Sequence, residues 1–332
     1  MTRFLIVRLG SLGDVVHAIP AIAALRERFP ESRIDWLTDP RYVALLELVR
    51  GIDRRLPIDT RRIPQMIGTI RELRRQRYDV VLDLQGLVKS AVLARASGAR
   101  RIIGFPAAHL REPAARYFYS ETPDPGTSRH VVFKNLSLLG ALGVRTTRAS
   151  FPLQIPESAT ATHVSSAEGP AGYALINPGA AWPNKRWPPE RFGVVASSIR
   201  DRYGVRSRVL WGPGEESLAA AVVSASAGAA DAAPPTTIPD LFALAAGARL
   251  MVSGDTGPLH IAGAVGTPIV ALFGPTFPGR NGPWAAGDVS ISRDATCICH
   301  YERRCRRGEP CINDISVDAV MDAVESRFAA RG

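Results

Sequence analysis

The feature that most constrains the fold is a regular alternation of short apolar runs with helical patterns, which occurs twice along the chain. In the first half, the runs cover 4–9, 33–37, 79–85 and 101–105, and amphipathic segments follow the first three at 15–29, 41–50 and 87–97. The second half restarts the pattern with a run at 173–179 and continues it to one at 268–274. Strands that alternate with helices predict parallel sheets with helical crossovers.

The chain is therefore predicted to form two doubly wound, Rossmann-like α/β domains. Its 332 residues fit two domains of about 150 residues each. We expect an N-terminal domain over 1–155, a Pro-, Ser-, Thr- and Ala-rich linker over 156–170, a second domain over 171–315 and a C-terminal helix over 316–332. Ligands of such domains bind outside the carboxyl ends of the strands, so we expect the site in a cleft between the domains.

The charge of the chain is concentrated in its first half. Residues 1–150 contain 25 Lys and Arg against 14 Asp and Glu, a net charge of +11, whereas the remainder has 16 against 17. This asymmetry predicts an anionic partner for the first domain. Nucleic acid is not expected, because aromatic residues make up only 7% and no stacking motif is evident. Without a cleavable signal or an apolar stretch of roughly 20 residues, the protein is expected in the cytoplasm.

One acid stands behind two glycines where the first strand turns into the first helix, in Leu9-Gly10-Ser11-Leu12-Gly13-Asp14. Such turns usually receive a phosphate, but a carboxylate would repel it, and the spacing is not G-x-G-x-x-G. Asp14 is either an ordinary helix N-cap or an acid placed there for function, and this stretch alone favours the cap.

The second half carries a comparable turn, Ser253-Gly254-Asp255-Thr256-Gly257, before a helix that contains His260. The amides of Thr256 and Gly257 predict an anion site aided by the helix dipole, with Asp255 on a sugar hydroxyl. Lys185 is the only lysine of this half and suits a terminal phosphate. Glu215 or Glu216 follows another strand and would accept both ribose hydroxyls, although a solvated helix start explains these glutamates equally well.

Several long motifs, in order, resemble the lipopolysaccharide heptosyltransferase family, and within it the type I enzymes that add the first heptose of the inner core. They are LGSLGDVVHAIPA (9–21), LDLQGLVKSA (82–91), IGFPAAHLREPAARYFY (103–119), HVVFKNLSLL (130–139), NKRWP (184–188) and SGDTGPLH (253–260). The resemblance implies the two-domain GT-B architecture and an inverting transfer of heptose from ADP-L-glycero-D-manno-heptose, without a metal or another cofactor.

The resemblance also assigns roles to residues of this chain. Asp14 matches the catalytic base, and the positions that match donor contacts are Lys185, Glu215, Asp255, Thr256, Gly257 and His260. The implied acceptor is the Kdo sugar of Kdo-lipid A at the inner face of the cytoplasmic membrane. Its anionic groups would account for the basic first domain, in which the matching positions are Arg61, Arg62, Lys89 and Arg111, each equally explained as a solvated surface charge. No obligate protein partner is evident.

Three alternatives stay open at this point. The chain can be a type II or type III heptosyltransferase or another ADP-sugar transferase of the family, or a non-catalytic nucleotide-sugar or anion-binding protein.

Four cysteines, Cys297, Cys299, Cys305 and Cys311, form a cluster whose C-x-C-x5-C-x5-C spacing does not match the usual paired C-x2-C of zinc sites. A structural zinc or iron–sulfur site and free thiols are both consistent with this cluster, whereas disulfides are not expected in the cytosol.

Overall fold

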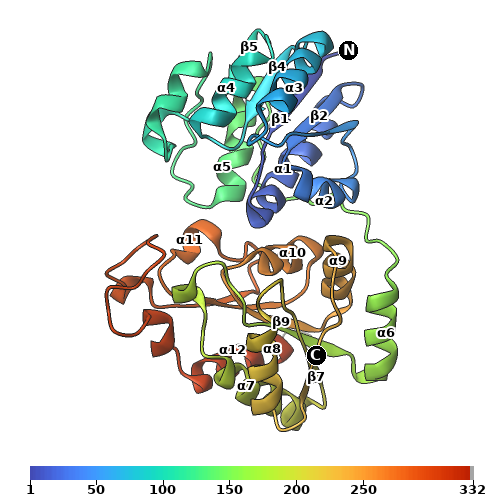
Figure 1. The fold of residues 1–332 in the computed structure, drawn as a ribbon, viewed down its shortest axis with the longest axis vertical. Helices are drawn as coiled ribbons and strands as arrows, with labels where there is room; N and C mark the ends of the chain where they lie inside the picture. Colours follow the sequence, from blue (N-terminus) through green and yellow to red (C-terminus); the bar gives the residue numbers. More distant parts are fainter. Residues whose placement is uncertain (330–332) are drawn as a thin grey trace. The chain divides into compact units, whose positions relative to one another are not determined.

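A computed structural model describes residues 1–329 and shows two compact units, one over Met1–Gln154 and one that begins at Ile155 (Figure 1). Each unit contains one parallel sheet, and the predicted pair of doubly wound α/β domains is confirmed. Among residues 1–329, no helix is both long and apolar enough to cross a membrane.

The first unit has a five-stranded sheet in the order β3-β2-β1-β4-β5. Its strands are β1 (Arg3–Val7), β2 (Arg33–Thr38), β3 (Arg54–Pro57), β4 (Val80–Asp83) and β5 (Arg101–Ile103). Its α-helices are α1 (Leu12–Arg28), α2 (Val43–Glu47), α3 (Ile63–Gln76), α4 (Val88–Ala96) and α5 (Val131–Ser137).

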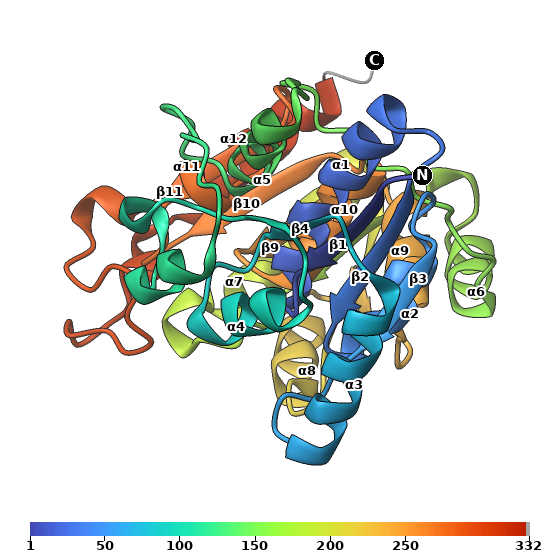
Figure 2. The same ribbon diagram turned by 90° about the horizontal axis from the view of Figure 1, so that it is seen from above.

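Alternating side chains of β1 explain why this sheet has helices on both faces. Leu5 and Val7 belong to a core that also contains Leu73 of α3 and Ala94 of α4. Phe4 points to the other face, where its ring lies 5.3 Å from that of Phe29 at the end of α1. In Figure 2, α1 and α5 accordingly lie on one side of the strands, and α3 and α4 on the other. A strand that is apolar at every position, as β1 is after Arg3, is typical of such a sheet.

The second unit has a six-stranded sheet in the order β11-β10-β9-β6-β7-β8. Its strands are β6 (Tyr173–Asn177), β7 (Arg206–Val209), β8 (Ala230–Ala232), β9 (Leu250–Gly254), β10 (Ile269–Phe273) and β11 (Val289–Ser292). Its α-helices are α6 (Ala159–Glu168), α7 (Pro189–Tyr203), α8 (Glu216–Ala225), α9 (Ile238–Gly247), α10 (Gly257–Val265), α11 (Pro278–Asn281) and α12 (Val317–Ala329).

The same alternation covers both faces of the second sheet. Ala174 and Ile176 of β6 join the core formed with α7, α8 and α12. Tyr173 points the other way and donates its hydroxyl to the Leu244 carbonyl of α9 at 2.7 Å. Figure 1 shows this sheet between α9 and α10 on one side and α7, α8 and α12 on the other.

The structure differs from the expected boundaries mainly at the linker. Most of the segment predicted as linker forms helix α6, which Ser158 caps by accepting the Ala161 amide at 3.0 Å. Ser158 also donates to Asp240 at 2.7 Å, so this segment belongs to the second unit. Its alanines favour a helix, and its few apolar side chains hid the periodicity. The C-terminal helix is observed as Val317–Ala329, and the last three residues of its predicted range, 330–332, lie outside the described residues.

Candidate functional site

In each unit, the predicted site residues follow the carboxyl ends of strands, either on the loop or in the first turns of the next helix. In the first unit they follow β1, β3, β4 and β5 and are Asp14, Arg61, Arg62, Lys89 and Arg111. In the second unit they follow β6, β7 and β9 and are Lys185, Glu215, Asp255, Thr256 and Gly257, with His260 one turn into α10. Carboxyl ends of parallel strands share one edge, so each unit gathers its own candidate residues.

Asp14 stands in the first turn of α1, held by groups on both of its carboxylate oxygens. Its Oδ2 accepts the Ser11 amide at 3.1 Å and the Ser11 hydroxyl at 2.9 Å, while its Oδ1 pairs with Arg8 Nη2 at 2.6 Å. Arg8 is buried, and its other terminal nitrogen donates to the Leu84 carbonyl. One third of the Asp14 side chain is still exposed, at 33%. Asp14 therefore bonds the N-cap residue Ser11 from the third helical position and remains a partly exposed carboxylate.

The turn before Asp14 is fixed by neighbouring loops of the same unit. Gln85 accepts the amides of Leu9 at 2.9 Å and Gly10 at 3.4 Å. Gly10 has a φ of +154°, and a Cβ at this position would lie 2.6 Å from the ring of Tyr42. A side chain at Gly10 is thus excluded both by backbone conformation and by the packing of Tyr42.

Part of the 82–91 motif forms a buried hydrogen-bond network around Asp83. Asp83 accepts the amides of Gln85 and Gly86, the hydroxyl of Ser90 at 2.9 Å and the hydroxyl of Tyr119 at 2.8 Å. Burial raises the pKa of Asp83 above its ordinary value, although these hydrogen bonds oppose the shift. The network joins the 82–91 motif to the 103–119 motif and shapes the loop that holds Gln85.

The four basic residues predicted to contact the acceptor are all exposed. Arg61 and Arg62 both approach Asp59, at 3.0 Å and 3.6 Å. Lys89 lies in the first turn of α4, where the Val88 amide donates to Glu112 at 2.8 Å. Because Glu112 directly follows Arg111, this hydrogen bond brings the loop of Arg111 to the start of α4. The four exposed cations therefore lie in two regions of this sheet edge, one after β3 and one where the start of α4 meets the loop after β5.

In the second unit, Asp255 is the centre of a buried charged cluster. Its Oδ2 accepts Lys185 Nζ at 2.6 Å and the hydroxyl of Thr276 at 2.8 Å, and its Oδ1 lies 3.5 Å from His260 Nε2. Lys185 also lies over the ring of Trp182, 4.6 Å from its centroid, and keeps 14% of its side chain exposed. Asp255 is nearly inaccessible, so the geometry makes it the group that positions Lys185 and His260 rather than a direct sugar contact.

Two opposing effects act on the pKa of Asp255. Burial alone would raise it, but the hydrogen bond from His260 and the charge of Lys185 together hold the pKa well below its ordinary value. The carboxylate is thus a permanent negative charge that fixes a cation beside the end of β9.

The N-terminus of α10 lies next to this cluster. Thr256 is the N-cap residue, and no side chain caps the helix there. The Thr256 hydroxyl instead accepts the side-chain amide of Asn177 at 3.1 Å. The first amides of a helix have no partner within the helix, and they favour an anion. Together with Lys185 they form a site suited to a phosphate group.

Glu215 lies at the end of the loop after β7 and points back toward the loop after β6. Its Oε2 accepts the Gly212 amide at 3.1 Å, and its Oε1 lies 3.9 Å from Arg186. A Cβ on Gly179 would lie 2.1 Å from Glu215 Oε2, so only glycine leaves room for this carboxylate. Glu216 is exposed at the start of α8. Of the two glutamates left open by the sequence, Glu215 therefore has the geometry of a site residue.

Some residues at these edges were not predicted. Arg8 and Gln85 hold Asp14 and its turn, and Thr276 holds Asp255. Arg8 breaks an otherwise apolar run, and Thr276 follows β10 directly after Gly274-Pro275. An arginine within an apolar run and a threonine just after a strand are the sequence signals from which Arg8 and Thr276 could have been predicted.

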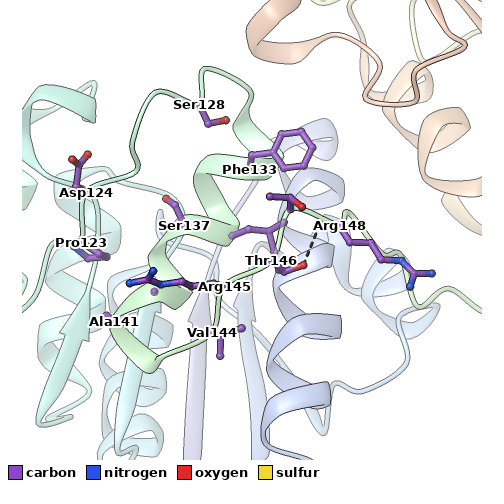
Figure 3. Close-up of a pocket in the computed structure, with 13 residues that line it drawn as sticks. Pro123, Asp124, Ser128, Phe133, Ser137, Ala141, Val144, Arg145, Thr146 and Arg148 are labelled. Carbon is purple, nitrogen blue, oxygen red and sulfur yellow. Dashed lines mark hydrogen bonds between the residues drawn. The ribbon is translucent and has the colours of Figure 1, made fainter.

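A surface pocket of about 1070 Å³ lies elsewhere in the first unit, beside α5 (Figure 3). The residues that line it include Phe133, Ser137, Val144, Arg145 and Arg148. The backbone amide of Arg148 donates to the Thr146 hydroxyl at 3.1 Å. None of the predicted site residues lines this pocket.

The four cysteines come together in the second unit. The sulfur of Cys299 lies 3.7 Å from that of Cys297 and 3.5 Å from that of Cys305, and all four thiols are free. Burial raises the pKa of Cys311 to about 12, with a hydrogen bond to Cys297 acting in the same direction. Within residues 1–329, no three His, Cys, Asp or Glu side chains are already arranged to hold a metal ion.

Comparison with known proteins identifies relatives along nearly the whole chain. The sequence profile of glycosyltransferase family 9 (heptosyltransferase) matches residues 66–310. Lipopolysaccharide heptosyltransferase 1 of Pseudomonas aeruginosa is 29% identical over 318 residues, which cover 91% of this chain and 87% of that protein. Lipopolysaccharide heptosyltransferase 3 of Escherichia coli K12 is 27% identical over 295 residues, which cover 84% of each.

Solved structures show the same similarity. The Escherichia coli heptosyltransferase WaaC with ADP superposes with a TM-score of 0.77 at 25% identity, over 99% of this chain and 98% of that one. WaaC with ADP-2-deoxy-2-fluoro heptose superposes with a TM-score of 0.76, also at 25% identity, over 98% of this chain and 99% of that one.

Proposed function

Because the chain belongs to glycosyltransferase family 9, the heptosyltransferases, we propose that it transfers heptose from ADP-L-glycero-D-manno-heptose to a Kdo sugar of Kdo-lipid A, in synthesis of the lipopolysaccharide inner core. That the chain is a glycosyltransferase follows from its family and relatives. One observation supports the donor part of this proposal: Lys185, Asp255 and His260 form a charged cluster beside an uncapped helix N-terminus. Such a site fits the diphosphate of a nucleotide sugar.

The proposed donor site uses each of these groups for a different part of ADP-heptose. Lys185 and the first amides of α10 bind the diphosphate, because a compact ammonium and helix amides both favour oxygen anions. Asp255, itself held by Thr276 and His260, keeps Lys185 in place. Glu215 accepts the ribose hydroxyls from the neighbouring loop. The support is the placement of these groups on adjacent loops of one sheet edge.

Asp14 is the proposed general base. The acceptor hydroxyl gives its proton to Asp14 as its oxygen bonds to the anomeric carbon of the heptose. The bond from that carbon to the phosphate oxygen breaks, and its electron pair leaves with ADP. A single displacement of this kind inverts the anomeric carbon. We propose no metal ion for this step, because Lys185 and the α10 amides compensate the charge that develops on the leaving phosphate.

The acceptor is proposed to bind through the exposed cations of the first unit. Arg61, Arg62, Lys89 and Arg111 suit the carboxylates and phosphates of Kdo-lipid A, since guanidinium groups pair well with both. The net charge of +11 over residues 1–150 would also draw the protein to an anionic membrane surface. We therefore propose that it works as a peripheral protein at the inner face of the cytoplasmic membrane.

The test is a transfer assay with the purified chain, Kdo-lipid A and a panel of nucleotide sugars. We expect product with ADP-heptose and little with ADP-glucose or UDP-sugars. The similarity to a heptosyltransferase 3 makes a later acceptor the second candidate, so the panel includes Kdo-lipid A that already carries heptose. Transfer only to the heptosylated acceptor would replace the type I proposal by a later step. No ADP-heptose turnover with any acceptor would contradict the proposed donor.

A further inference from the structure

The segment 297–311, between β11 and α12, folds around sulfur. Cys297, Cys299 and Cys311 are buried and Cys305 is half-buried, and together they form a separate cluster. The larger apolar side chains of this segment point outward instead, with Ile298 63% exposed and Tyr301 44% exposed. Until a short turn begins at Cys311, no helix or strand forms within this described stretch. The four sulfurs are therefore the interior of this segment.

Two contacts among three of these sulfurs are close in length to those of a four-thiolate metal site. Four sulfurs at 2.3 Å from a tetrahedral ion lie about 3.8 Å from one another. The observed contacts are 3.7 Å between Cys297 and Cys299 and 3.5 Å between Cys299 and Cys305, both far longer than a disulfide bond. The thiols do not yet surround one point as ligands do. Binding of an ion would require the cysteine side chains to turn toward a common centre.

The cysteine segment is also attached to both loops that build the charged cluster around Asp255. The Tyr301 amide donates to the Pro275 carbonyl at 3.1 Å, and Pro275 precedes Thr276. The side-chain amide of Asn184 donates to the Glu302 carbonyl at 2.9 Å, and Asn184 precedes Lys185. Backbone groups of the cysteine segment thus hold the neighbours of two residues that contact Asp255.

We propose that Cys297, Cys299, Cys305 and Cys311 bind one thiophilic divalent ion, zinc or iron(II), which fastens the 297–311 segment to the loops of Lys185 and Thr276. Each thiol releases its proton to solvent as its sulfur bonds to the ion. Four protein ligands complete a tetrahedral shell and leave no open position, so the ion has a structural role. Folding around it would take the place of the apolar core that this segment lacks.

The first experiment measures metal content in the full-length chain purified without chelators or affinity metals. We expect about one zinc or iron per chain by elemental analysis. Cys299→Ser and Cys311→Ser should each lose it, whereas His300→Ala should keep it, because His300 is exposed and adjoins Cys299 without belonging to the cluster. A wild-type chain that is metal-free, or Cys→Ser variants that retain the ion, would overturn the proposal, as would a disulfide found by mass spectrometry.

A second measurement covers the case in which the serine variants do not fold. A mercurial reagent should release the ion from the folded wild-type chain in proportion to the thiols it modifies, as followed with a zinc- or iron-binding dye. Release without thiol modification would place the ion elsewhere and overturn the assignment.

The fastening role rests on the proposed donor site and has its own readout. Removing the ion should weaken ADP binding by calorimetry by about tenfold, and returning it should restore the affinity. ADP affinity that is unchanged by removal would overturn the fastening role. A metal-loaded chain that does not bind ADP would instead contradict the proposed function. The metal site would still be supported in that case, because elemental analysis tests it independently of ADP binding.

Discussion

At the scale of single residues, Asp14 shows why the pattern around it supported two interpretations. The simpler interpretation, that Asp14 is the N-cap of α1, is wrong in detail: Ser11 is the N-cap, and Asp14 lies at the third helical position, where it accepts the Ser11 amide and hydroxyl. It also keeps a third of its side chain exposed and is anchored by Arg8. One carboxylate therefore bonds the N-cap residue and is also the proposed base. The sequence could not show this anchoring. In the sequence, Arg8 appears only as a charged residue that interrupts an apolar run, and its burial and its pairing with Asp14 require the structure.

Asp255 supports a prediction about pH at the same scale. Its pKa in the folded state lies below the ordinary value of 3.8, so its ionised form contributes stability that is present above that value. This stability is lost as the pH falls below about 4, because the unfolded chain then binds the proton more readily. We expect the free energy of unfolding to fall in that range, and to fall less steeply in Asp255→Asn.

Tryptophan fluorescence in urea is the measurement, since four of the five tryptophans, Trp182, Trp187, Trp211 and Trp284, belong to the second unit. Equal slopes of stability against pH in the wild-type and Asp255→Asn chains would show that this carboxylate is not held as described.

At the scale of elements, the strands with apolar runs were predictable, including the edge strand β5, whereas the edge strands β3 and β8 were not. The two Arg residues of β3 hide its strand character, and β8 is only three residues long. Both are at the edge of their sheet, where a strand needs fewer apolar side chains. The 82–91 and 103–119 motifs were found as sequence patterns, but their shared network around Asp83 required the structure.

This network predicts a stability difference between two tyrosines of one turn. Tyr119→Phe removes a hydrogen bond from the buried Asp83 carboxylate, and we expect it to destabilise the first unit by about 1–3 kcal/mol. The matched control is Tyr117→Phe, because Tyr117 is 88% exposed and should change stability by less than about 0.5 kcal/mol. Urea unfolding followed by circular dichroism measures both. Equal effects would contradict a structural role of the Asp83 network.

At the scale of the whole molecule, the sequence predicted two α/β units and placed its candidate site residues after strand ends, where the structure has them. It also predicted that the excess positive charge belongs to the first unit, which the structure bounds at Gln154. It did not predict that most of the linker is a helix of the second unit, or that the cysteine segment is attached to the loops around Asp255. Those features depend on contacts between residues far apart in the chain, which local patterns do not encode.

The central claim is that the two units divide the reaction, with the donor bound by the second and the proton removed by Asp14 of the first. Kinetics and ADP calorimetry on Asp14→Asn test it most directly, with Asp39→Asn as the matched control, since Asp39 is also an arginine-paired carboxylate at the same sheet edge. We predict that Asp14→Asn lowers kcat by about 10²–10⁴-fold and leaves ADP affinity unchanged, while Asp39→Asn stays near wild type. Wild-type turnover in Asp14→Asn, or an equal loss in both variants, would contradict it.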